Sequence, residues 1–390
     1  MNSSGELAAS RLMPSEYDAL ESAERMRLTN RMIEAFRPVT FAATGYPVHV
    51  SDERELWRYV DVMHETRLRD TIENVLHGLT PDEFAVFRRA ISFMCDFTVR
   101  NFGKPLRCEN ALLRAMNVYR YIRAFNPRTV MELGPGSGYL GLLHILDGTG
   151  YIGCDNSQSF YLLQNRLWAT AAGDRFSELA QDPRSLRAAL SEDLHGKAVH
   201  VPWWKLIDLE LDALPAAVDV VTANHCLAEM QHNALRYSLR LAYRLLAARK
   251  GPVVFKGWGY ELLHPRALVA REFDSAGFGL YHLDDHIAAF ASRDRPATEY
   301  LALPRPVSLK RRLRNFTRRI VGLERIPYEY DVTIYSGHND VSSAIRHTND
   351  GVKKAATLNY ADVTAFLSKV YGDETSPEER FLALIDRRYG

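Results

Sequence analysis

Three glycines at alternate positions follow a short apolar run that ends in an acid, in the segment TVMELGPGSGYLG, residues 129–141. They are Gly134, Gly136 and Gly138, and the acid is Glu132. Glycine adopts backbone conformations that other residues avoid, so such a turn lets the main chain approach a ligand closely. The pattern raises the question of whether the ligand is a dinucleotide, a nucleoside triphosphate or another cofactor.

Two common phosphate-binding loops fit this segment poorly. A Walker A loop needs GxxxxGK[ST], and no lysine follows these glycines in that position. A dinucleotide fingerprint places its third glycine where this chain has Tyr139. An acid at the strand end instead favours a ligand that carries positive charge, and Glu132 supplies one. Both the ammonium and the sulfonium of S-adenosylmethionine are positive, which favours that cofactor.

A change of pattern at Pro127 divides the chain into three predicted regions. Apolar residues at helical spacing indicate a helical N-terminal region over residues 1–126. Short apolar runs then alternate with helical patterns over residues 127–305, which predicts parallel βαβ units in an open α/β sheet. We expect seven strands, with the last two, GLYHL and EYLALP, forming a hairpin. Residues 306–390 form a C-terminal extension.

A second acid supports the same cofactor. In sheets of this kind an acid at the end of the second strand holds the ribose hydroxyls, and the run GYIGCD ends in Asp155. The third predicted strand ends in Trp203 and Trp204. An indole offers a flat apolar face to adenine, although tandem tryptophans also serve as packing residues, and both interpretations stay open.

The sequence VMELGPGSG resembles the first motif of the class I S-adenosylmethionine-dependent methyltransferases. The resemblance implies a Rossmann-like seven-stranded methyltransferase sheet, in which the glycine loop wraps the methionyl group and Glu132 helps to position it. It also implies that Asp155 binds the ribose and that Asn156 lies near the adenine, with Trp203 as a stacking candidate. The closing hairpin separates this fold from nicotinamide-binding domains.

The residues after the fourth strand, NHCLAEM, face the methyl group in this fold. A hydroxyl acceptor is poorly nucleophilic until a base removes its proton, and histidine, with an ordinary pKa of about 6.5, suits that task. We therefore predict His225 as the general base, with a loop-holding role as the alternative. Asn224 is assigned to the cofactor side. Glu229 either assists the histidine, contacts the acceptor, binds a metal or is an ordinary helix-start carboxylate.

Two further segments bear on the acceptor. Lys256 and Trp258 follow the fifth strand and are candidates for lining an acceptor pocket. The segment HLDDH, residues 282–286, is the densest group of metal-ligand types, but it belongs to the sixth-strand region. Since that region lies away from the expected point of methyl transfer, we interpret it as a solvated loop and predict no metal.

Composition limits the partners. The chain is 46% hydrophobic and 25% charged with a net charge of +1, which is typical of a globular protein without a polyanionic partner. The four cysteines form no CxxC pair, and no apolar stretch approaches the roughly 20 residues that span a bilayer. The [DNS]PP[FYW] signature of nucleic-acid amino-methylases is missing after the fourth strand. We expect a cytoplasmic protein with a small-molecule acceptor, with neither nucleic acid nor a membrane as partner; a homodimer stays open.

The segments ELGPGSGYLG, SQSFYLLQNRLW and NHCLAEMQHNALRYSLRLAYRLL are most similar to a group of bacterial sugar O-methyltransferases. This resemblance implies methyl transfer to a hydroxyl of a sugar or glycosylated natural product, as in bacterial secondary metabolism. His225 and Cys226 depart from the smaller polar residues of that group. The alternatives are methyl transfer to nitrogen or carbon, and a non-catalytic S-adenosylmethionine-binding protein.

Overall fold

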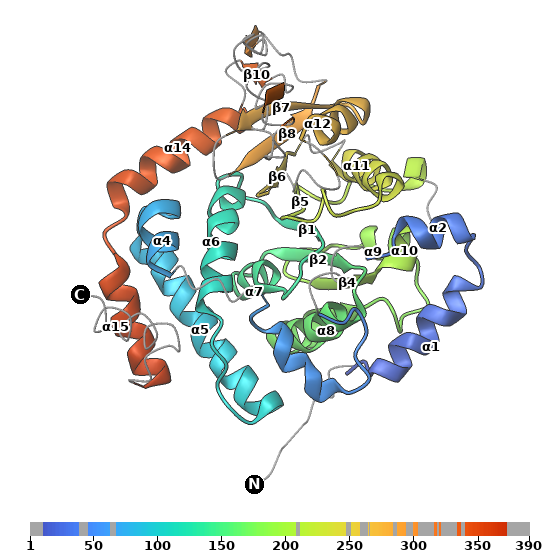
Figure 1. The fold of residues 1–390 in the computed structure, drawn as a ribbon, viewed down its shortest axis with the longest axis horizontal. Coiled ribbons are helices and arrows are strands. Elements are labelled where there is room, and N and C mark those ends of the chain that lie inside the picture. The colour runs from blue at the N-terminus through green and yellow to red at the C-terminus, as the bar shows by residue number, and fades with distance from the viewer. Residues whose placement is uncertain are drawn as a thin grey trace.

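A computed structural model provides the fold (Figure 1). It describes residues 11–38, 46–62, 68–207, 211–246, 251–257, 264, 266–283, 287–293, 299–302, 316–317, 320, 334–336 and 340–372. Trp258 and the acidic pair of the HLDDH segment lie outside the described residues.

The N-terminal region is helical, as its periodicity predicts. Its elements are α1 (Pro14–Arg25), α2 (Asn30–Ala35), η1 (Glu53–Tyr59), α4 (Leu68–Asp70), η2 (Thr71–Val75), α5 (Pro81–Phe102) and α6 (Glu109–Arg123). Helix α5 begins with a capping box, in which the Thr80 side chain accepts from the Glu83 amide and the Glu83 side chain accepts from the Thr80 amide. Its apolar stripe, which includes Phe87, Ile91 and Met94, is buried and fixes the helix against the core.

A central sheet follows the N-terminal helices. The described strands are β1 (Thr129–Leu133), β2 (Gly150–Asp155), β3 (Phe176–Glu178), β4 (Ala198–Pro202), β5 (Val220–Thr222), β6 (Val253–Phe255), β7 (Phe278–Leu283), β8 (Ala288–Ser292), β9 (Glu299–Ala302) and β10 (Ile334–Ser336). Their order is β3-β4-β2-β1-β5-β6-β8-β7-β10-β9. The strands from β3 to β6 are parallel, and β8 lies antiparallel between β6 and β7.

The prediction of seven strands is wrong in two respects. The described residues form a ten-stranded sheet, and the strand that closes it beside β7 is β8, not the segment EYLALP. That segment contributes β9, which pairs with β10 of the C-terminal extension. The sequence AAFAS of β8 consists mainly of small residues with low strand propensity. It forms a strand because it pairs with β6 along one edge and with β7 along the other, while its residues Ala288 to Ala291 are buried in the core.

Helices cover the sheet on both sides and the extension closes one flank. They are α7 (Tyr139–Leu146), α8 (Gln158–Ala172), η3 (Gly173–Arg175), α9 (Leu186–Leu190), α10 (Trp203–Ile207), η4 (Leu211–Ala213), α11 (His232–Leu246), α12 (Arg266–Ser275), α14 (Asp340–Ala355) and α15 (Tyr360–Tyr371). In Figure 1 the red helices α14 and α15 run beside the cyan α5 and the green α6, and the same pairs are in contact. The C-terminal helices therefore pack against α5 and α6 of the N-terminal region.

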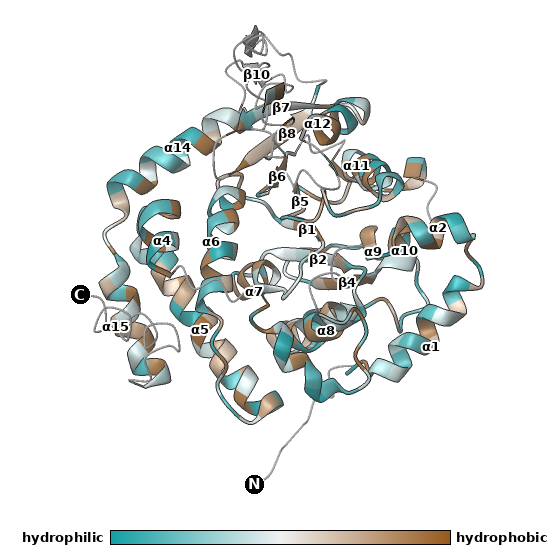
Figure 2. Cartoon of the chain, viewed as in Figure 1, coloured by the Kyte–Doolittle hydropathy of each residue, from teal (hydrophilic) through white to brown (hydrophobic). Residues whose placement is uncertain are grey.

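The distribution of apolar residues agrees with this layering. Figure 2 shows brown segments on the central strands, whereas α11 and α14 mix teal and brown along their lengths. Helix α11 buries Leu235, Leu239 and Leu245 on one face, which is typical of an amphipathic helix on a sheet. None of the described helices has both the length and the apolar character needed to cross a membrane.

Candidate cofactor and active site

The glycine loop runs from the end of β1 to the start of α7. Gly134, Gly136 and Gly138 all have positive φ angles, of 68°, 57° and 81°. A Cβ on Gly134 would lie 2.8 Å from the Cβ of Cys226, and the Gly134 amide donates to the Cys154 carbonyl over 2.8 Å. The left-handed backbone and the close approach of Cys226 explain why this turn needs glycine.

Glu132 of β1 and Asn224, which follows β5, come together beneath this loop. Asn224 Nδ2 donates to Glu132 Oε1 over 3.0 Å, and the Tyr151 hydroxyl donates to Oε2 over 2.5 Å. Burial raises the pKa of Glu132 to about 7, against the lowering effect of these two hydrogen bonds, and the negative charge of Asp155 raises it further. A buried acid that titrates near neutrality favours a cationic ligand beside it.

Asp155 ends β2 and faces the glycine loop. Its Oδ2 accepts from the Gly136 amide over 3.2 Å and from Gln164 Nε2 over 2.9 Å, and its Oδ1 accepts from the Ser157 amide over 3.0 Å. Burial raises its pKa, while these same donors oppose the rise. A carboxylate has about four acceptor positions, so three protein donors leave capacity for a ligand hydroxyl.

Gln164 is a site residue that the sequence analysis missed. Its Nε2 donates both to Asp155 and to the Gly136 carbonyl, the latter over 2.6 Å, and so ties the loop to the acid. The residue lies in the middle of α8 and is fully buried. A buried glutamine leaves no signal in apolar periodicity, because the helical pattern alone does not reveal which polar side chains face inward.

The N-terminal region closes over the carboxyl ends of β2 and β4. Asn156 Nδ2 donates to the Phe36 carbonyl over 2.8 Å, and Trp203 Nε1 donates to Glu21 Oε1 over 2.7 Å. The rings of Phe36 and Trp203 stack at a centroid distance of 6.1 Å. Both residues predicted to lie near adenine are therefore held by the N-terminal segment, and their roles toward the cofactor stay predictions.

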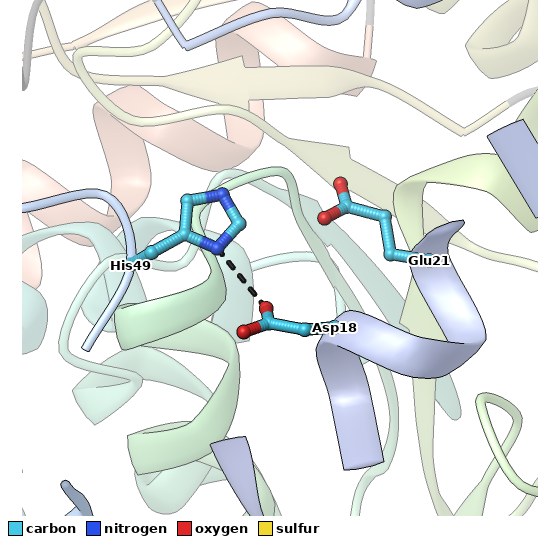
Figure 3. Close-up of side chains that lie close together, drawn as sticks. All are labelled: Asp18, Glu21 and His49. Atoms are coloured by element: carbon cyan, nitrogen blue, oxygen red, sulfur yellow. Dashed lines mark hydrogen bonds and ion pairs between the residues drawn. The ribbon is translucent and has the colours of Figure 1, made fainter. Parts of the chain in front are cut away.

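The N-terminal segment also contains a group of three side chains of the kinds that bind metal ions. Asp18 and Glu21 of α1 face His49, with ligand atoms within 4.8 Å of one another (Figure 3). These groups already have protein partners: His49 Nδ1 lies 3.1 Å from Asp18 Oδ1, which also accepts from Gln158, and Glu21 accepts from Trp203. We interpret the group as a structural hydrogen-bond cluster that connects α1 with residues 46–50 and with the start of α8.

His225 lies at the carboxyl end of β5 and is exposed. It has a positive φ of 60°, which is rare for a residue with a side chain and tends to occur at functional sites. Its amide donates to the Lys256 carbonyl over 2.9 Å, while the Lys256 amide donates to Asn224 Oδ1 over 3.0 Å. These two hydrogen bonds join the ends of β5 and β6. They place His225, the predicted base, next to Asn224, which contacts Glu132.

Three further residues, Gly257, Lys256 and Glu229, lie close to His225 in the chain or in space. A Cβ on Gly257 would lie 2.3 Å from His225 Nδ1, so the imidazole rests on a position that only glycine leaves open. Lys256 is half-buried, and burial, followed by the charge of Arg114, lowers its pKa. Glu229 is half-buried in the turn after Cys226, to whose carbonyl its amide donates over 3.0 Å.

The parallel strands from β3 to β6, the antiparallel β8 and the glycine loop after β1 form a Rossmann-like α/β sheet. The predicted fold class is confirmed, apart from its strand count.

Comparisons with known proteins gave matches only among solved structures. No family model and no curated protein matches the chain. The chain is similar to a TehB-like S-adenosylmethionine-dependent methyltransferase from Corynebacterium glutamicum, at 14% identity and a TM-score of 0.30 over 45% of this chain and 86% of that chain. It is also similar to magnesium protoporphyrin IX methyltransferase from Synechocystis with bound S-adenosylmethionine, at 12% identity and a TM-score of 0.28 over 55% and 98%. An O-methyltransferase family protein from Burkholderia thailandensis matches at 14% identity and a TM-score of 0.30 over 75% and 74%.

Proposed function

We propose that this protein binds S-adenosylmethionine at the glycine loop and transfers its methyl group to a hydroxyl of a small molecule. The observation that carries the proposal is the buried pair of Glu132 and Asn224 beneath three left-handed glycines, with Asp155 at the end of the neighbouring strand. This donor set fits the cofactor, because Glu132 suits its ammonium and the remaining acceptor capacity of Asp155 suits a ribose hydroxyl.

The bound cofactor would supply an electrophilic methyl group, and the residues of this chain would prepare the acceptor. The bond from the methyl carbon to sulfur would break as its bond to the acceptor oxygen forms, which leaves S-adenosylhomocysteine. His225 would take the proton that the oxygen loses and later release it to water. The exposed position of His225 beside Asn224 supports this role, since an acceptor must approach from outside the sheet. The sequence resemblance favours a sugar or a glycosylated natural product as acceptor.

The first experiment is a calorimetric titration with S-adenosylhomocysteine, the demethylated product, with NADH as the competing candidate. We expect micromolar binding of S-adenosylhomocysteine alone, abolished by Asp155→Ala or Gly136→Val. Gly148→Val is the matched control, because Gly148 also has a positive φ with open space around it but follows α7, away from the loop. Binding of NADH alone, or loss of affinity in the control as well, would refute the cofactor assignment.

The second experiment tests the base. His225→Ala should lower turnover by roughly 100-fold or more, the usual contribution of a general base, while the affinity for S-adenosylhomocysteine stays unchanged. His195→Ala is the control, because His195 is an exposed histidine in the turn that precedes β4. Equal losses of binding and turnover would show a structural role. Full activity in His225→Ala would favour a nitrogen acceptor, which needs little help from a base.

A further inference from the structure

A row of buried polar side chains crosses the sheet beneath α8. The strand register aligns Glu178 of β3 with His200 of β4, His200 with Gly153 of β2, and Gly153 with Glu132 of β1. A Cβ on Gly153 would lie 2.3 Å from the Trp168 ring, which therefore fills the gap in the row. Glu178, His200 and Glu132 are all buried, so each needs specific partners to offset its desolvation.

Glu178 is surrounded by donors. Its Oε1 accepts from the Ala180 amide over 2.8 Å and from the Tyr161 hydroxyl, and its Oε2 accepts from Asn165 Nδ2 over 2.8 Å. His200 Nδ1 lies 2.7 Å from the same Oε2. Hydrogen bonds to a carboxylate favour its ionised form. The three other donors around Glu178 therefore favour the arrangement in which His200 Nδ1 donates to it.

The other ring nitrogen of His200 is fixed by Gln164. The Nε2 of Gln164 donates to Asp155 Oδ2 and to the Gly136 carbonyl, both of which accept, so the amide orientation is determined. Its Oε1 then faces His200 Nε2 at 3.1 Å and is itself only an acceptor. His200 must donate from both ring nitrogens, which is the hydrogen-bonding pattern of an imidazolium.

We propose that His200 is a buried imidazolium that acts as a positioning residue for the cofactor: through Gln164 it holds Asp155 and the glycine loop in their binding geometry. The inference rests on the proposed function for its ligand, but the charge state of His200 does not depend on it. The ring is enclosed by Tyr161 at 3.6 Å, stacked, by Trp168 at 4.9 Å and by Phe176 at 6.2 Å between centroids. The ionisable groups that face this network from the surrounding elements are Glu178, Asp155, Tyr161, Cys154, Tyr17 and Glu132. Glu132, with a pKa of about 7, titrates in the wild type and in every variant alike, so only a difference between variant and wild type is assigned to Asp155.

The charge of His200 has a measurable consequence for Asp155. Burial raises the pKa of Asp155, and the positive charge of His200 is among the effects that lower it. Without that charge the pKa of Asp155 rises further, so the carboxylate needed for the ribose is lost at a higher pH. Cofactor affinity should then begin to fall at a higher pH as the solution is acidified.

The test measures S-adenosylhomocysteine affinity from about pH 5 to about pH 8, the range in which histidine and shifted acids titrate. His200→Gln removes the charge, and Gln164→Met removes the link while it leaves His200 in place. Both variants should weaken binding roughly 10- to 100-fold at neutral pH, the usual effect of a lost hydrogen bond to a charged group. Both should also move the acid limb, the part of the profile in which affinity falls as the pH is lowered, to higher pH. Phe176→Leu is the control, because Phe176 packs near His200 without entering the network; it should leave the acid limb in place.

A second measurement is made on the wild-type protein without cofactor, so its result does not depend on whether His200→Gln folds. ¹⁵N-histidine NMR of the wild-type protein at neutral pH should show one buried imidazole protonated on both nitrogens, assigned to His200 by its change in Gln164→Met. A neutral His200 ring, or a wild-type acid limb in both network variants, would overturn the proposal. If the imidazolium is present but the wild-type protein does not bind S-adenosylhomocysteine, the proposed function fails and the positioning role for that cofactor fails with it.

Discussion

The buried carboxyl of Glu132 should make this protein less stable as the pH rises, and Glu132→Gln should remove that effect. Its pKa lies at about 7 in the folded protein, against an ordinary value of 4.5. Below the ordinary value the group is protonated in both the folded and the unfolded state. Between the two values the folded state keeps a proton that the unfolded state has released, so the free energy of unfolding falls with rising pH. Above about pH 7 both states are ionised, and the loss is complete.

The magnitude follows from the two pKa values. One pKa unit corresponds to about 1.4 kcal/mol, so ionised Glu132 costs the fold about 3 kcal/mol at pH 8. Glutamine keeps the shape and still accepts from Asn224 through its oxygen, while its amide nitrogen faces the Tyr151 oxygen. The variant should therefore gain about 2 to 3 kcal/mol over the wild type between pH 5 and pH 8, and should lose cofactor affinity at pH 8.

Denaturant unfolding of both proteins at the two pH values measures this difference. The control is Glu192→Gln, because the Glu192 carboxylate is exposed and its pKa is lowered by Lys197 rather than raised by burial. If wild type and Glu132→Gln lose stability in parallel as the pH rises, the carboxyl is not held in a desolvated site and the argument for a cation beside it fails.

Two further predictions concern other parts of the structure. Arg120→Met should lower the free energy of unfolding by about 3 to 5 kcal/mol, the range for breaking a buried ion pair, because Arg120 pairs with the carboxylate of Glu83 and donates to the carbonyls of Leu76 and Gly78, ahead of α5. Thermal unfolding checks this, and a change within the error of the wild type would contradict it. Gly257→Ala should displace the His225 ring, since the new Cβ would lie 2.3 Å from Nδ1. Turnover should fall while S-adenosylhomocysteine affinity stays unchanged, and equal losses of both would place Gly257 in the cofactor site.

The sequence by itself determined the parts of this protein that depend on local chemistry. The alternate glycines permit a left-handed backbone, and the structure gives all three positive φ angles. Glu132 and Asp155 end apolar runs, so their places at the ends of β1 and β2 follow from strand periodicity alone. The sequence also placed Asn224 after a strand of the same sheet, and its contact with Glu132 follows once β1 and β5 lie side by side.

Only the tertiary structure decided the features that depend on contacts between distant segments. The Ala-rich β8 forms a strand because β6 and β7 bury it, not because its residues favour extended structure. The amide of Gln164 joins Asp155 to His200, and the N-terminal segment holds Trp203. Burial and partner geometry set the charge of these groups, and neither can be known until α8, β4 and the N-terminal helices have packed together.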